Sequence, residues 1–137
     1  MRSRTLPFRP LAFAGLCALL PLAACGGEPC EDTIVEEVTA PDEPWVAAVM
    51  TRVCDEDAVG TVEGVEHAFL KAVLMRPITR ENYGEDPLED ALFIVKGDWP
   101  IEIFWTRTGW FTIDFDGPPD KLLKWSGNYA NGMVLYD

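Results

Sequence analysis

The chain has 137 residues, which is enough for one domain and too few for two. Its 23 Asp and Glu residues outnumber 11 Lys and Arg residues, so the formal net charge is −12 at pH 7. A field of this sign repels nucleic acid and anionic lipid headgroups, which excludes both as expected partners. It favours solubility, a cationic partner or bound cations.

The first 24 residues have the pattern of a removable export signal. Three arginines give a positively charged start, and an apolar run at 11–20 follows. This run is too short to span a membrane as a helix, and prolines flank it on both sides. We therefore expect residues 1–24 to be cleaved rather than retained as an anchor.

Leu22-Ala23-Ala24-Cys25 directly follows the apolar run. This stretch resembles the lipobox of bacterial lipoproteins, in which a signal peptidase cuts before the cysteine. The resemblance implies that a diacylglyceryl group on Cys25 anchors the chain in the lipid bilayer of the cell envelope. The next residue is Gly26 and not Asp, which implies the outer membrane, facing the periplasm, in a two-membrane bacterium. In a one-membrane bacterium it implies the outer face of the cell membrane.

Cleavage before Cys25 leaves 8 basic and 23 acidic residues, because the signal contains three arginines and no acids. It also leaves Cys30 and Cys54 as the only thiols that carry no lipid. Exported proteins usually pair two such cysteines, and closing this loop stabilises a fold by roughly 3.5 kcal/mol in the chain-entropy model. A metal-binding pair has less support, because neither cysteine has a CxxC neighbour and the chain has one histidine. We predict a disulfide, with no metal or cofactor.

The first half of the domain is harder to assign than the second. We expect a lipidated tether at 25–33 and a folded domain at 34–137, with strands at 34–39 and 45–54 around a proline-rich turn. The segment 61–75 has apolar residues at helical spacing and good helix formers, yet alternation also fits a strand. Helix and strand both stay open for this segment.

In the last third of the chain, two segments show a clear alternation of apolar and polar residues. After a polar loop at 76–90 and a strand at 91–96, two alternating runs at 101–107 and 110–116 are joined by Thr108-Gly109, which predicts a β-hairpin. Its inward residues would be Ile101, Ile103 and Trp105 on the first strand and Phe111, Ile113 and Phe115 on the second. The runs at 121–125 and 133–136 flank turn residues and predict a closing hairpin. The fold class is therefore mostly β, a small antiparallel domain after the export signal.

A family resemblance supports this fold. Cys30, the run from Ala40-Pro-Asp-Glu-Pro-Trp45 to Arg52-Val-Cys54, and the later alternating strands are similar to a family of small exported bacterial proteins of uncharacterised role. The match spans roughly residues 30–116 and implies a mostly antiparallel β domain with a strand after the second cysteine. Just after Cys54 this chain has Asp55-Glu56-Asp57 where the family has glycine and small polar residues.

No catalytic constellation stands out. His67 is the one histidine and has no nucleophile motif near it, so we expect it to be packed or solvated. Two pairs of carboxylates are close in sequence, but such pairs are common by chance in a chain with 23 acids; they are Asp114 with Asp116, and Asp98 with Glu102. Among five tryptophans, Trp99 and Trp110 lie at turns and are the candidate ligand contacts.

These observations predict an envelope lipoprotein that is not an enzyme. The acidic charge favours a binding or structural module, with an inhibitor or immunity-type lipoprotein for a cationic envelope protein as one alternative. A binder of small ligands or glycans through exposed tryptophans is another. A hydrolase would require convergent carboxylates in a concave pocket.

Overall fold

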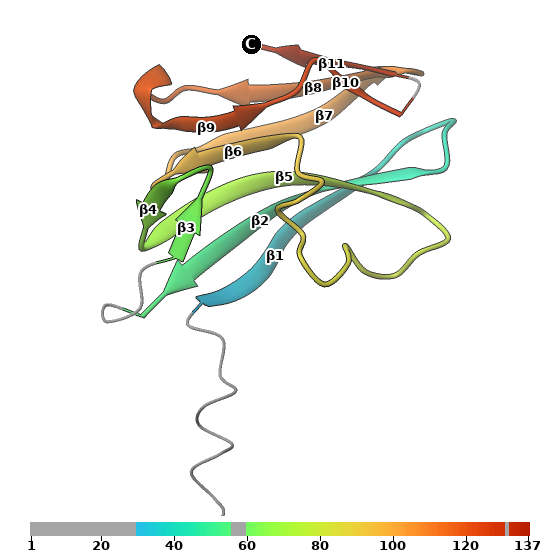
Figure 1. Ribbon diagram of the computed structural model, residues 1–137. Coiled ribbons are helices and arrows are strands. Elements are labelled where there is room, and N and C mark those ends of the chain that lie inside the picture. The colour runs from blue at the N-terminus through green and yellow to red at the C-terminus, as the bar shows by residue number, and fades with distance from the viewer. Residues whose placement is uncertain (1–29, 56–59, 131) are drawn as a thin grey trace, which may run out of the picture.

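A computed structural model describes residues 30–55, 60–130 and 132–137, which consist mainly of strands (Figure 1). The prediction of a mostly β, largely antiparallel domain is confirmed, whereas the export signal and Cys25 lie outside the described residues. The elements are β1 (Cys30–Thr39), β2 (Trp45–Cys54), β3 (Gly60–Val62), β4 (Val65–His67), β5 (Phe69–Pro77), β6 (Phe93–Lys96), β7 (Ile101–Arg107), β8 (Trp110–Phe115), a 3₁₀ turn (Pro119–Lys121), β9 (Leu122–Trp125), β10 (Asn128–Tyr129) and β11 (Gly132–Tyr136).

Two sheets face each other across the domain (Figure 1). The first has five antiparallel strands in the order β1-β2-β5-β6-β9. The second has four strands in the order β10-β11-β8-β7, in which β11 runs parallel to β8 and the other pairs are antiparallel. Strands β3 and β4 form a separate small hairpin.

The main core lies between the two sheets. Val73 and Phe93 of the five-stranded sheet pack in one buried cluster with Ile103, Phe111 and Ile113 of the four-stranded sheet. In β7 and β8 every second side chain points to the same face, so the alternation in the sequence puts the apolar residues inward. The hairpin predicted across Thr108-Gly109 is confirmed, with the expected register of inward residues.

A second apolar cluster covers the opposite face of the five-stranded sheet. Met50, Leu70 and Leu74 pack there with Leu88 and Ala91 of the long loop between β5 and β6. Because this loop shields one face and the second sheet shields the other, β2 and β5 are buried on both sides. This explains why the sequence of β2 is apolar without alternation.

The segment 61–75 is extended, so its helical propensity does not decide its structure. Glu63 and Gly64 turn the β3–β4 hairpin with φ values of 51° and 75°, the pattern of a type I′ turn. The central strand β5 pairs with β2 on one side and β6 on the other. The apparent helical spacing from Val62 to Val73 therefore runs across two hairpin strands and one central strand.

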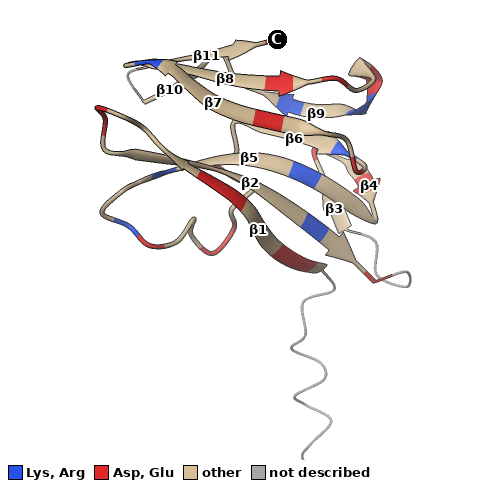
Figure 2. Ribbon diagram, turned by 180° about the vertical axis from the view of Figure 1, so that it is seen from behind, with Lys and Arg blue, Asp and Glu red and all other residues tan. Residues whose placement is uncertain are grey.

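Strand β1 is an acidic edge strand held by ion pairs (Figure 2). The guanidinium of Arg52 in β2 bonds both carboxylate oxygens of Asp32, and Arg76 of β5 reaches Glu37 at 3.0 Å. Charged side chains on an edge strand also oppose pairing with a strand of another chain. The edge is thus tied to its own sheet and protected.

Two expectations about chain organisation are wrong. The runs at 121–125 and 133–136 do not pair, because β9 joins β6 in the first sheet and β11 joins β8 and β10 in the second. The predicted tether reaches too far, because β1 begins at Cys30 and residues 30–33 already pair with β2.

Substitution of Phe111 by alanine tests the main core. The ring is fully buried and contacts the rings of Trp105 and Tyr129, so Phe111→Ala should lower the free energy of unfolding by about 3–5 kcal/mol. Denaturant titration followed by tryptophan fluorescence measures the change. Val53→Ala, at a residue that is 50% exposed, is the control and should cost less than about 1 kcal/mol. Equal effects would contradict the assignment of the core.

Candidate functional site

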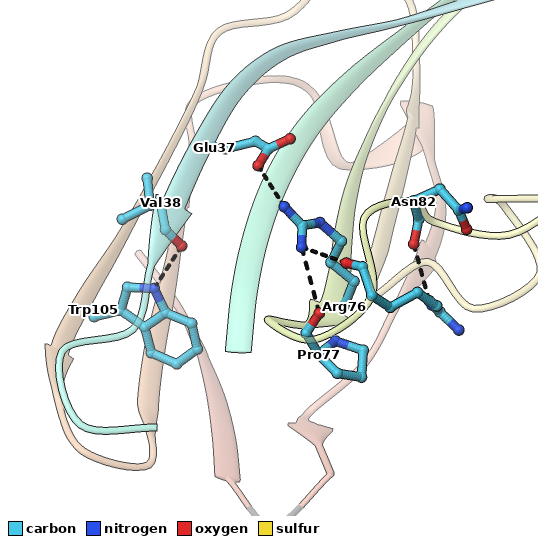
Figure 3. A network of polar contacts seen from close by, with 7 residues as sticks. Glu37, Val38, Arg76, Pro77, Asn82 and Trp105 are labelled. Carbon is cyan, nitrogen blue, oxygen red and sulfur yellow. Dashed lines mark hydrogen bonds and ion pairs between the residues drawn. The ribbon is translucent and has the colours of Figure 1, made fainter. Parts of the chain in front are cut away.

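The two sheets are joined by direct contacts on the side where β1 faces β7. The indole Nε1 of Trp105 donates a hydrogen bond to the carbonyl oxygen of Val38 at 3.1 Å (Figure 3). Close by, Arg76 pairs with Glu37 and also donates to the backbone carbonyl of Arg80 in the following loop. Strand, loop and second sheet are locked together on this side.

On the opposite side, between β9 and β11, a pocket of about 240 Å³ opens between the sheets. At its inner end Phe93 is 1% exposed, and at its rim Trp125 is 66% exposed, so the pocket leads from the core to the surface. Its lining is predominantly aromatic and apolar with one carboxylate; it comprises Phe93, Phe115, Leu122, Trp125, Tyr136 and Asp137.

The aromatic walls of this pocket are held by contacts within the chain. The hydroxyl of Tyr136 donates to the carbonyl oxygen of Ser126 at 2.7 Å and accepts a hydrogen bond from the Ser126 N–H at 3.0 Å. The ring of Tyr136 meets the ring of Trp125 edge-on, with centroids 6.0 Å apart. A largely preformed apolar pocket with a few polar groups at its mouth is the usual form of a binding site.

The two tryptophans that the sequence singles out are both partly buried and engaged. Trp99 donates from Nε1 to the carbonyl oxygen of Lys96 at 3.1 Å and packs against the main core. Trp110 lies under the guanidinium of Arg107, whose Cζ is 3.9 Å from the ring centroid. Their role as ligand contacts stays a prediction. Trp125 is the most exposed tryptophan of the described chain, and the sequence did not single it out because the run Lys121-Leu-Leu-Lys-Trp125 does not alternate and so indicates no outward face.

The structure does not keep both of the carboxylate pairs that are close in sequence, because it separates Asp98 from Glu102. Glu102 of β7 is the cross-strand partner of Asp114 of β8, and with Asp116 they line a depression of about 160 Å³. Asp98 instead pairs with Lys71, whose Nζ lies 2.8 Å from the carboxylate. Paired carboxylates can act as general acid, general base or nucleophile in glycoside hydrolysis, so Glu102, Asp114 and Asp116 are the candidates for such chemistry.

The predicted disulfide between Cys30 and Cys54 is present, and the two cysteines are cross-strand partners. It joins the first residue of β1 to the last residue of β2. His67, at the end of β4, is 1% exposed and lies beside it, with one ligand atom from each of the three residues within 4.8 Å of the others. Sequence reasoning expected a packed or solvated His67 and missed this neighbour, because the contact depends on the β3–β4 hairpin folding back.

The hydroxyls of the tyrosines are in protected surroundings. Tyr129 donates to a carboxylate oxygen of Glu43 at 2.7 Å, and burial together with this carboxylate raises the pKa of Tyr129 strongly. Burial also raises the pKa of Tyr83 and of Tyr136. The chain has three tyrosines, so every one of them resists ionisation in the folded state.

Alkaline titration tests this arrangement. A tyrosine with a raised folded-state pKa leaves stability unchanged below its unfolded pKa of about 10, and above it the unfolded chain releases protons that the folded chain retains. The free energy of unfolding should therefore fall as the pH rises beyond about 10. Tyrosinate absorbance should appear together with the loss of the far-ultraviolet circular dichroism signal. Tyrosinate formation well before unfolding would contradict the burial of these groups.

Comparisons of the chain with protein-family models, with curated proteins and with solved structures find no match. The resemblance to a family of small exported proteins therefore stays a prediction. Within the described residues, no helix has the length and apolar character needed to cross a membrane.

Proposed function

We propose that the chain is a lipoprotein of the bacterial cell envelope, anchored through Cys25, which binds a cationic partner protein and carries out no catalysis. The lipobox-like Leu22-Ala23-Ala24-Cys25 after an export-type signal supports the anchor. Gly26 favours the outer membrane, facing the periplasm, in a two-membrane bacterium. A disulfide between Cys30 and Cys54 fits an oxidising compartment of this kind.

The charge of the chain supports a cationic partner. Beyond residue 24 there are 23 acidic and 8 basic residues, so most carboxylates have no cation of their own chain to neutralise them. Acidic residues occur on both sheets, such as Glu36 on β1, Glu102 on β7 and Asp114 on β8 (Figure 2). Such a surface accelerates encounter with a basic protein and loses its effect at high salt.

The pocket at Trp125 gives this partner a specific anchoring point, and it is the observation on which the proposal depends most. A Lys or Arg side chain has an apolar stem and a charged head. The stem suits a pocket walled by Phe93, Phe115 and Tyr136, while the head suits the exposed ring of Trp125 and the carboxylate of Asp137. Tryptophan at the centre of an interface commonly supplies much of the binding energy.

Trp125→Ala should weaken binding enough to lose capture of the partner while leaving the fold intact, because the side chain is 66% exposed. The measurement is cross-linked affinity capture of the lipidated protein from its own envelope at low and high salt. Wild type should retain one stoichiometric basic protein at low salt only. Met133→Ala, at a residue of β11 that is 49% exposed and does not line the pocket, is the matched control and should retain it too.

The purified partner then gives the affinity. Loss of Trp125 should weaken binding by about 2 kcal/mol or more, which is roughly 30-fold in the dissociation constant. Capture of no basic protein, or equal capture by Trp125→Ala, contradicts the proposal. Quenching of tryptophan fluorescence by an envelope glycan would instead identify the chain as a glycan binder. If Trp125→Ala were quenched as well, Trp99 or Trp110 would be the residue that contacts the glycan.

A further inference from the structure

His67 and the two disulfide cysteines form a compact cluster at one end of the five-stranded sheet. Cys54 is 7% exposed, His67 is 1% exposed, and Cys30 is half-buried. The backbone at Gly60 approaches closely: a Cβ added there would lie 2.9 Å from Nε2 of His67 and 3.1 Å from Sγ of Cys30. A glycine at this position therefore leaves room for the imidazole and the sulfur to approach each other.

The ring of His67 is buried, and its hydrogen-bond partner is the backbone of Val65 in the same strand, which can satisfy only one of the two ring nitrogens. Nearly all buried polar side-chain atoms in proteins have such a partner, since an unpaired one loses its hydration without compensation. A buried histidine with an unpaired ring nitrogen next to two sulfur atoms offers the donor types that bind a metal ion.

We propose that reduction of the Cys30–Cys54 disulfide converts this cluster into a zinc site, with the two thiolates and the imidazole of His67 as its protein ligands. Two sulfur ligands and one nitrogen ligand form a donor set that Zn²⁺ prefers, and three protein ligands leave a fourth position for water. The disulfide and the metal site are alternative states of the same three side chains.

The present geometry is close to what the ion requires. Zn–S bonds of about 2.3 Å and Zn–N bonds of about 2.0 Å in a tetrahedron place the ligand atoms about 3.5–3.8 Å from one another. The ligand atoms here already lie within 4.8 Å. Cys30 begins β1 and Cys54 ends β2, so the sulfurs can separate by side-chain rotation with little change to the rest of the sheet.

The redox step balances with a dithiol reductant. The reductant supplies two electrons and two protons, leaves as its own disulfide, and converts Cys30 and Cys54 into thiols. Zn²⁺ then displaces the two thiol protons and binds the neutral imidazole. Burial lowers the pKa of His67, which favours this neutral form. The site does not depend on the cationic partner proposed above, since it involves different residues.

Cobalt binding to the full chain tests the site. Cys17→Ser and Cys25→Ser leave Cys30 and Cys54 as the only thiols, and the protein is kept in detergent because the apolar run remains. After reduction without oxygen, one Co²⁺ per chain should bind and give a thiolate charge-transfer band and the visible bands of tetrahedral cobalt. Zn²⁺ should remove these bands, and the oxidised protein should show none of them.

Three substitutions separate a ligand from a structural role. His67→Phe should weaken Co²⁺ binding by at least about 10-fold, which is the effect of losing even an outer partner of a metal ligand. His67→Cys should keep the site and strengthen the charge-transfer band through a third thiolate. Val65→Ala, in the same strand, is the matched control and should bind as wild type does.

Three outcomes overturn the proposal. The first is a reduced protein without the thiolate band. The second is equal cobalt binding by the oxidised protein or by both His67 variants without a change of spectrum, since the ion would then occupy surface carboxylates. The third is a reduced chain that loses its β-sheet circular dichroism and does not regain it with Zn²⁺, because the strands then fail to hold the ligands together.

Discussion

Burial of both faces of the five-stranded sheet is the constraint on which the rest of the structure depends. One face packs against the four-stranded sheet, and the other is covered by the loop between β5 and β6. The hydrophobic effect thereby acts on both sides of β2, β5 and β6, which contain fully buried residues such as Met50, Val73 and Phe93. The central strands have no polar face to present to solvent, so functional groups are confined to edges, ends and the second sheet.

The edges of this sandwich differ for a physical reason. On the β1–β7 side, the indole N–H of Trp105 donates a hydrogen bond to the carbonyl oxygen of Val38, and this bond joins the two sheets. On the β9–β11 side, the hydroxyl of Tyr136 bonds to Ser126 and leaves aromatic faces lining an open pocket. Aromatic residues thus close one side of the domain and line an open pocket on the other, according to where their polar atoms find a partner.

The ends of the sheet carry the remaining chemistry. The disulfide fixes the start of β1 against the end of β2. The β3–β4 hairpin adds His67 to the same end. The aromatic pocket at one edge and the disulfide–imidazole cluster at one end involve different residues, so each can be altered without the other.

The sequence by itself determined the features that depend on residues close together in the chain, or on very few possible pairings. Alternation in β7 and β8 with a two-residue turn decided their hairpin, and two remaining cysteines decided the disulfide. It also indicated a strand from Trp45 to Cys54. Local pattern reports the periodicity and burial of a segment, and these properties follow from the residues themselves.

Only the tertiary structure decided which strands pair and what their side chains meet. Contacts between distant segments put β9 and β11 into different sheets and divide the segment 61–75 among β3, β4 and β5. They also leave Trp125 exposed and bring His67 to the disulfide. Helix propensity in 61–75 is worth less than burial of a central strand, since packing outweighs intrinsic preference. Alternation within a strand shows which of its faces is apolar, but it does not show which other segment will cover that face.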